Sequence, residues 1–239
     1  MNTNISTYID LYNELDELLW KIIWVTDNFM QFKEKLYELR NKKYHISWFI
    51  RSYFDELVKF WYIRNELVHK YKNYIDVTQS TIDNLEKFIR IIRNPQTCFD
   101  IFKVDVYCCD FHSSLVDEIK EMKRNLFTHI PVFDWNEFKW VLSESCITYF
   151  IWEQTEQDWT LLLDNIKISD INLENWNDLY EFIDRKKTIY EIEDMFSEMI
   201  YENKRLGVIF ITNLWKKWEK IDGIITAWDL PKIKQLYFN

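Results

Sequence analysis

The second half of the chain contains the same succession of sequence features twice. In the first copy SSLVDEIKEM is followed by HIPVFD and VLSES, and in the second copy KTIYEIEDMF is followed by RLGVIFIT and GIITAWD. A helix-like stretch therefore precedes two strand-like stretches in each copy. Such self-similarity predicts two copies of one supersecondary unit. Aligning the copies pairs Ser114 with Thr188, His129 with Arg205, Val132 with Val208 and Ser143 with Thr226.

The pattern of apolar residues after Pro95 favours an α/β arrangement. Short apolar runs rich in β-branched and aromatic residues alternate there with helical stretches, as expected when strands and helices alternate along a chain. The predicted strands are Phe102 to Tyr107, Ile130 to Phe133, Val208 to Thr212 and Gly223 to Thr226.

The N-terminal third reads as helix. Between Thr7 and Arg40, apolar residues recur at the three-and-four spacing of one buried helical stripe. These residues are Leu11, Leu15, Leu18, Leu19, Ile22 and Ile23. Thr7 and Asp10 resemble a helix start. Further periodic stretches cover 44–72 and 80–93, and Asn94-Pro95 ends the last of them. Such helices joined by short turns predict an antiparallel bundle.

These patterns divide the chain into four segments. Residues 1–95 form an all-α helical bundle, 96–152 a first α/β module, 153–184 a linker that packs on the outside of the modules, and 185–239 a second module. The predicted fold class is therefore α+β and multidomain, with the bundle followed by a tandem pair of modules. Almost half of the residues are apolar, which is enough for real cores.

Charge is distributed unevenly between these segments. Residues 1–95 contain 14 Lys and Arg against 13 Asp and Glu, whereas residues 96–239 contain 16 against 26. Because acidic surfaces repel phosphate backbones, any RNA contact is expected in the N-terminal segment. The chain has only two glycines, Gly207 and Gly223, which excludes glycine-rich phosphate-binding loops.

The cysteines and the apolar runs indicate in which cellular compartment the protein is expected. Cys98, Cys108, Cys109 and Cys146 show no CxxC spacing, so neither a zinc site nor a disulfide framework is expected, and no metal is predicted. The sequence shows no signal-peptide pattern and no apolar run long enough to cross a membrane. We therefore expect a cytoplasmic protein without membrane contact.

The repeated unit resembles a known module. A Ser/Thr-capped helix, a strand ending in PV or GV, and G-I-I-T-x-x-D opening a final helix are similar to the CBS domain, and RLGVIFIT with GIITAWDLP is the closer of the two matches. The resemblance covers 96–239. It implies a pseudo-symmetric α/β sandwich whose clefts bind adenosine-containing ligands such as AMP, ADP or ATP, and which often dimerises.

The second module supplies the candidate nucleotide site. Asp229 follows Thr226 by three residues, so its carboxylate can accept hydrogen bonds from both hydroxyls of a ribose. Thr226 can contact a phosphate at the start of a helix, and Arg205 can neutralise phosphate charge. An alternative is that Thr226 only caps the last helix and Asp229 is a first-turn acid. The remaining residues that the resemblance implies are Lys187, Thr188, Gly207 and Ile224.

The first module departs from the pattern. Trp140 stands at the expected glycine, and Cys146 stands at the expected ribose-reading acid. A thiol cannot replace two charge-assisted hydrogen bonds. The corresponding candidate residues are Ser114, His129 and Ser143, but we expect one occupied cleft per chain, in the second module.

A second, local resemblance lies in the bundle. FWYIRNELVHKYK contains Arg64-Asn65-x-x-x-His69, which is similar to the R-N-x-x-x-H signature of HEPN domains, helical modules that often act as metal-independent ribonucleases. The resemblance implies catalysis by Arg64, Asn65 and His69 across a homodimer. Asn65 and His69 share one helix face, whereas Arg64 is about 140° away from His69 around the axis. The alternative is a helix end whose basic residues only complement the helix dipole.

Two hypotheses of function follow. In the first, an adenine nucleotide bound by the paired modules controls a HEPN-like effector that cleaves RNA as a metal-independent endoribonuclease. In the second, the protein is a non-catalytic nucleotide-binding scaffold or the regulator of a partner protein. Both predict a homodimer. They differ in whether Arg64 and His69 act on RNA or only hold the bundle together.

Overall fold

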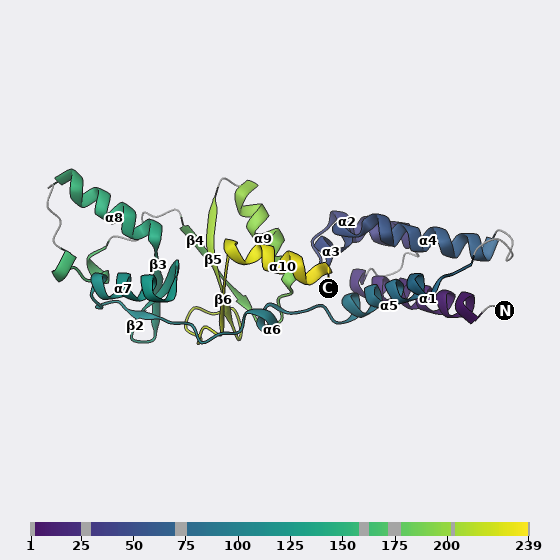
Figure 1. Cartoon of the computed structure of the whole chain (residues 1–239), viewed down its shortest axis with the longest axis horizontal. Helices are drawn as coiled ribbons and strands as arrows, with labels where there is room; N and C mark the ends of the chain where they lie inside the picture. The colour runs from purple at the N-terminus through teal and green to yellow at the C-terminus, as the bar shows by residue number, and fades with distance from the viewer. Residues whose placement is uncertain are drawn as a thin grey trace. The chain divides into compact units, whose positions relative to one another are not determined.

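The computed structural model of the chain describes residues 3–24, 30–69, 76–157, 163–171, 178–201 and 204–238 (Figure 1). These residues form a mixed α+β protein that divides into two compact units. The first unit comprises Met1–Thr97 with Thr188–Asp194, and the second comprises Cys98–Lys187 with Met195–Asn239. None of the helices described combines the length and the apolar character needed to cross a membrane.

The first unit is helical. Its helices are α1 (Thr3–Ile23), α2 (Phe32–Asn41), α3 (Ser47–Ser52), α4 (Phe54–His69) and α5 (Gln79–Arg93). The helix start predicted at Thr7 and Asp10 is wrong, because α1 is already helical at Thr3. Thr78 caps α5, since its Oγ1 accepts a hydrogen bond from the backbone amide of Thr81 at 3.3 Å.

The apolar stripe of α1 faces the interior of this unit. Leu15, Leu19 and Ile23 are buried, and Leu11, Leu18 and Ile22, which flank them, are half-buried. The phenol of Tyr8 lies fully inside and donates a hydrogen bond to the carbonyl oxygen of Phe60 at 2.8 Å. The three-and-four periodicity therefore identified the buried face of α1 from sequence alone.

The first module of the second unit contains β1 (Cys109–Asp110), α7 (Leu115–Asn125), β2 (His129–Asp134), β3 (Glu137–Ser143) and α8 (Glu144–Gln157). Strand β1 is parallel to β2, and β2 is antiparallel to β3. The strand predicted at Phe102 to Tyr107 is wrong: residues 98–102 form α6 (Cys98–Phe102), and no strand is assigned at 103–107. Alternation of apolar residues cannot distinguish a single helical turn from a short strand.

The second module repeats this order. It contains β4 (Asp178–Asp184), α9 (Ile189–Tyr201), β5 (Arg205–Thr212), β6 (Gly223–Thr226), η3 (Ala227–Asp229) and α10 (Leu230–Phe238). Strand β4 is parallel to β5, and β5 is antiparallel to β6. Strand β4 lies inside 153–184, the segment that sequence analysis assigned to a linker, so part of that segment belongs to a sheet.

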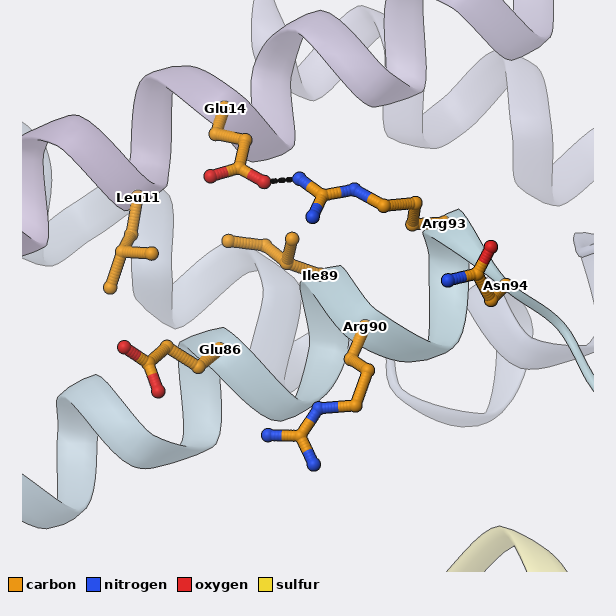
Figure 2. Close-up of a pocket in the computed structure, with 7 residues that line it drawn as sticks. All are labelled: Leu11, Glu14, Glu86, Ile89, Arg90, Arg93 and Asn94. Atoms are coloured by element: carbon orange, nitrogen blue, oxygen red, sulfur yellow. Dashed lines mark ion pairs between the residues drawn. The ribbon is translucent and has the colours of Figure 1, made fainter.

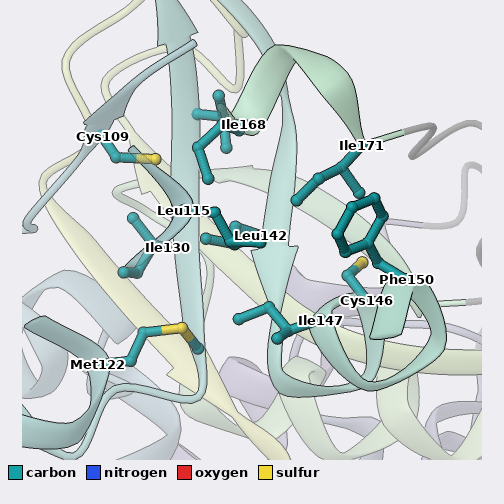
Figure 3. Packing of buried hydrophobic residues seen from close by; sticks show 11 residues of the cluster. Cys109, Leu115, Met122, Ile130, Leu142, Cys146, Ile147, Phe150, Ile168 and Ile171 are labelled. Carbon is teal, nitrogen blue, oxygen red and sulfur yellow. The ribbon is translucent and has the colours of Figure 1, made fainter. Parts of the chain in front are cut away.

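Another part of the same segment enters a core. Residues 163–171 contribute the side chains of Ile168 and Ile171 to the apolar cluster of the first module, where both are buried. Figure 3 shows them beside Leu115 of α7 and Phe150 of α8. The expectation that this segment packs on the outside is therefore wrong for residues 168 and 171.

Strand register gives the correct alignment of the two copies. His129 lies opposite Ser143, and Val208 lies opposite Thr226. His129 therefore corresponds to Val208, and the predicted pairing of His129 with Arg205 is wrong. The shared valine of the PV and GV strands caused the error, because β5 begins earlier relative to its partner than β2 does. Aligning Ser143 with Thr226 is consistent with the register.

The turn after the first strand is also duplicated. The Oδ1 atom of Asp110 accepts a hydrogen bond from the backbone amide of His112 at 2.8 Å. The Oδ1 atom of Asp184 accepts one from the backbone amide of Lys186 at 2.7 Å. Each aspartate stands four residues before the Ser or Thr that precedes the following helix. This Asx turn is a repeat signal that reading for apolar strands misses.

Each module is also paired with a segment from elsewhere in the chain. Leu115 N donates to Ile166 O at 2.9 Å, and Ile168 N donates to Ser113 O at 3.0 Å. In the second copy, Ile189 N donates to Gln96 O at 3.1 Å, and Cys98 N donates to Lys187 O at 2.7 Å. The segment before the second module therefore pairs with the start of α7 in the first, and the segment before the first module pairs with the start of α9 in the second. This exchange of segments is part of the duplication.

Gly223 allows the backbone at Phe102 to pass close to β6. A Cβ atom at this position would lie 2.5 Å from the carbonyl oxygen of Phe102 and 3.0 Å from Cδ1 of Ile211. Because the first contact is with backbone, Gly223→Ala is expected to lower the free energy of unfolding by about 1–3 kcal/mol, the usual cost of overpacking. Urea unfolding measures this change. Ser197→Ala on an exposed position of α9 is the control and should stay within about 0.5 kcal/mol of the wild type. An unchanged midpoint in Gly223→Ala would contradict the close approach.

Candidate functional site

The most ordered polar junction among the predicted site residues lies between Thr226 and Asp229. Thr226 ends β6, and Asp229 ends the η3 turn that follows. The backbone amide of Thr226 donates to Oδ2 of Asp229 at 2.8 Å, and the Thr226 hydroxyl donates to the same oxygen at 3.1 Å. Asp229 therefore caps the amide of Thr226, which precedes the η3 turn and not the last helix directly. Both of these hydrogen bonds use Oδ2 of Asp229, so Oδ1 can accept hydrogen bonds from a ligand.

Three other predicted residues lie on the strands of this sheet. Gly207 is buried in β5, next to Val208, the strand partner of Thr226. Ile224 of β6 is half-buried against an apolar cluster. Arg205 is exposed at the start of β5. The strand framework therefore brings Gly207, Thr226 and Asp229 to one end of the β5–β6 hairpin.

Thr188 has a different environment from the one that the resemblance implied. It belongs to the first unit and is 5% exposed. Its hydroxyl, with a single proton to donate, lies 2.9 Å from His45 O and 3.0 Å from Oε2 of Glu191. The backbone amide of Lys187 donates to Asp184 O at 3.2 Å, in the turn after β4. Both residues therefore have backbone or side-chain partners that hold the start of α9.

The equivalent junction of the first module has Cys146, and not an acid, at the position of Asp229. The Oγ atom of Ser143 accepts a hydrogen bond from the Cys146 amide at 3.2 Å, so the turn resembles that at Thr226. The Cys146 thiol is 3% exposed and belongs to the apolar cluster in Figure 3. His129 lies beside this junction in β2, with Nδ1 at 2.9 Å from Oγ1 of Thr128. A buried thiol offers a ribose no charged acceptor.

The Trp140 side chain fills space in the first module. It packs edge-on against Phe111, with ring centroids 5.1 Å apart, and lies against the same core. Its buried Nε1 has no hydrogen-bond partner among the described residues. Ser114, the remaining predicted residue, forms an isolated antiparallel β-bridge with Lys167 through the backbone. These contacts give the first module a filled apolar interior at the position where the second has Gly223.

The R-N-x-x-x-H residues lie on α4. Arg64 and Asn65 are half-buried, and Nη1 of Arg64 donates to Oδ1 of Asn65 at 3.1 Å. The guanidinium carbon of Arg64 is 5.9 Å from the ring centre of Tyr12, whose pKa is raised by burial. The buried Nε of Arg64 has no hydrogen-bond partner among the described residues. His69 is the last residue of α4, and its side chain lies outside the described residues.

Sequence reasoning missed a small pocket between α1 and α5. It has a volume of about 250 Å³, and Arg90, Glu86 and Leu11 contribute to its lining. Figure 2 shows Glu14 of α1 ion-paired with Arg93 of α5 across it. The sequence feature that indicates this pocket is the i,i+3 spacing of Arg90 and Arg93, which places both side chains on one face of α5. Because two glutamates and two arginines balance the local charge, this pocket does not favour an anion over a cation.

No protein-family model matches the sequence, and no curated protein matches it. Among solved structures, a signal-transduction protein with CBS domains from Burkholderia ambifaria is 14% identical, with 57% of this chain and 92% of that chain covered and a TM-score of 0.43. The CBS domain pair of protein MJ0100, in complex with methylthioadenosine and S-adenosyl-L-methionine, is 12% identical over 59% and 98% of the two chains, with a TM-score of 0.43. CBSX2 in complex with AMP is 13% identical over 60% and 99%, with a TM-score of 0.42.

Proposed function

We propose that the protein is an adenine-nucleotide-responsive regulator in which the paired modules of the second unit control the helical first unit. The observation that carries this proposal is the Thr226–Asp229 junction, where the carboxylate is held in place by two hydrogen bonds at 2.8 and 3.1 Å. A positioned carboxylate whose Oδ1 has no hydrogen-bond partner in the part of the chain that the structure describes suits a ribose diol, because a charged acceptor forms stronger hydrogen bonds than a neutral one.

The other elements of the site supply contacts to the rest of the nucleotide. In this proposal the second oxygen of Asp229 accepts the ribose hydroxyls, while Arg205 at the start of β5 approaches the phosphates. Gly207 leaves room beside the ribose because it has no side chain. The ligand class is an adenosine nucleotide, AMP, ADP or ATP. The replacement of the equivalent acid by Cys146 in the first module limits binding to the second.

Helix α9 is the element through which binding reaches the first unit. Its residues Ile189–Asp194 are grouped with the first unit, and the rest of it with the second. Within the first unit, Tyr190 stacks against Trp48 with ring centroids 6.4 Å apart, and Nη2 of Arg51 donates to Oδ2 of Asp194 at 2.6 Å. If α9 has two arrangements, a ligand that binds one of them more tightly increases the population of that arrangement. The size of the increase is set by the difference between its two affinities.

The effector half of the proposal has two forms. In the first, two chains form a homodimer in which Arg64, Asn65 and His69 cleave RNA without a metal. In the second, the bundle is a docking surface without catalysis. The first form requires a phosphate to reach the Nη atoms of Arg64, because its Nε is buried and has no hydrogen-bond partner among the described residues.

Isothermal titration with AMP, ADP, ATP and S-adenosyl-L-methionine tests the sensing role. We expect about one nucleotide per chain, because Cys146 stands in the first module where Asp229 stands in the second. Two equivalent sites would contradict the role given to Asp229, and no heat or thermal stabilisation with any of the four would contradict nucleotide sensing itself. A ligand at 100 times its dissociation constant stabilises the folded state by about 2.7 kcal/mol, which a thermal melt detects independently.

A further inference from the structure

A pocket lies where the tips of two hairpins of the second unit meet. One wall is the turn between β2 and β3, with Trp135, together with Phe138 of β3. The other is the loop between β5 and β6, with Lys217 and Trp218. The pocket has a volume of about 690 Å³, within the range of roughly 300–1,000 Å³ typical of small-molecule sites. It is at the opposite end of β6 from Thr226, since the loop precedes Gly223.

The two tryptophans that line this pocket are largely exposed to solvent. Trp135 is 91% exposed and Trp218 is 71% exposed, although an indole ring gains more from burial than almost any other side chain. Trp135 also has a φ of 55°, in the left-handed region that bulky residues rarely adopt. Such a backbone conformation costs about 1–3 kcal/mol. Trp215 has the same φ and is also exposed, so it is the lining of the pocket that distinguishes Trp135.

Hydrogen bonds and ring contacts fix both walls. Oε2 of Glu219 accepts hydrogen bonds from the backbone amides of Leu214 at 2.6 Å and Lys216 at 3.3 Å, which closes the loop on itself. The ring of Phe138 in β3 lies 5.1 Å from that of Tyr180 in β4, a strand of the other sheet. A pocket whose walls are held in this way loses little conformational entropy when a ligand binds.

The charged groups around the pocket are already compensated. Lys139 is paired with Glu137 at 2.7 Å and with Asp134 at 3.7 Å. The ammonium of Lys216 lies 5.3 Å from the ring centre of Trp218, and that of Lys217 lies 5.0 Å from the ring centre of Tyr180. A ligand cation would therefore meet ammonium groups beside the aromatic rings, and an anion would meet two carboxylates. The balance favours a neutral ligand with many hydrogen-bonding groups.

We propose that this pocket binds a neutral saccharide. The apolar C–H face of a pyranose ring stacks on the Trp218 or Trp135 indole, and its hydroxyls donate to the carboxylates of Asp134 and Glu137 and accept from the ammonium of Lys217. The amide of Asn136 can serve as both donor and acceptor. The proposal does not depend on nucleotide binding, because none of these residues belongs to the Thr226–Asp229 junction.

Indole NMR signals test the proposal on the full-length chain. Each of the twelve tryptophans contributes one indole N–H signal, and Trp135→Phe and Trp218→Phe assign the two of interest. Maltose, cellobiose, lactose and trehalose are titrated separately. We expect saturable shifts of both signals with at least one disaccharide, and a loss of affinity of about tenfold or more in Trp218→Ala, as for an aromatic stacking partner worth about 1–3 kcal/mol.

Trp228→Ala is the matched control, because Trp228 is 82% exposed in the same unit but lies next to the nucleotide junction. It should leave disaccharide affinity unchanged. Three results overturn the proposal: no shift of either signal with any of the four sugars, shifts only with tetramethylammonium, or shifts only with a single-stranded oligonucleotide. The last two would identify the pocket as a site for organic cations or for nucleic acid. Unchanged thermal melts of the exposed-tryptophan variants exclude unfolding as the cause.

Discussion

Asp229→Ala is expected to weaken AMP binding by about 100-fold. The substitution removes the charged acceptor that the junction holds in place. Hydrogen bonds to charged groups contribute about 1.5–3 kcal/mol each, and 1.4 kcal/mol is a factor of ten in affinity. Because Oδ2 is already held by Thr226, the loss falls on the contacts made through Oδ1. Isothermal titration or competition with a fluorescent AMP analogue measures the change.

The chain supplies a matched control for the structural part of this effect. Oδ2 of Asp170 accepts a hydrogen bond from the backbone amide of Lys167 at 2.9 Å, which is the same capping geometry three residues apart. Asp170→Ala therefore removes an equivalent cap, worth about 1 kcal/mol of stability, without touching the proposed site. It should leave AMP affinity unchanged. Equal losses of affinity in the two variants, or none in Asp229→Ala, would show that Asp229 only caps the turn.

How much of this site the sequence revealed depended on the kind of pattern involved. The three-residue spacing of Thr226 and Asp229 was readable because a strand ending at a helix start is a local feature with its own residue preferences. The mismatches at Trp140 and Cys146 were readable for the same reason. In the structure Cys146 lies in a core and Trp140 fills the position corresponding to Gly223, so these substitutions have direct physical consequences.

The errors arose where the deciding interaction is non-local. The alignment of His129 with Arg205 followed a shared valine, whereas the register is set by the partners of Ser143 and Thr226 across the hairpins. Strand β4 was missed because its neighbour along the sheet, β5, is separated from it by a whole helix. A strand of this kind is defined by its pairing more than by its own composition.

The exposed tryptophans show a further limit of sequence reading. Tryptophans at helical spacing are usually core residues, and sequence alone gave no reason to separate Trp135 and Trp218 from the rest. Their exposure follows from the left-handed backbone at Trp135 and from the loop closed by Glu219. Backbone geometry and a hydrogen bond across five residues therefore determine which aromatic rings face solvent.

The second large effect concerns RNA. If the bundle acts as proposed, the purified chain cleaves single-stranded RNA in the presence of EDTA, and His69→Ala lowers the rate by about 100-fold or more, since general acid–base groups contribute about 10²–10⁴. Arg64→Ala is expected to have a similar effect, because its guanidinium would stabilise the developing negative charge on the phosphate. Electrophoresis of an end-labelled oligonucleotide measures both rates, with and without AMP.

Lys59→Ala separates catalysis from charge. Lys59 is an exposed cation on α4, the same helix, so its removal lowers the net charge of the helical unit by the same amount as Arg64→Ala. If the lysine variant loses as much activity as Arg64→Ala, the arginine acts through general attraction of RNA. A wild type that leaves RNA intact with and without AMP, together with a strongly destabilised Arg64→Ala, would contradict the ribonuclease form. The half-buried Arg64, hydrogen-bonded to Asn65 and next to Tyr12, would then be a structural cation, and the nucleotide would control a docking surface.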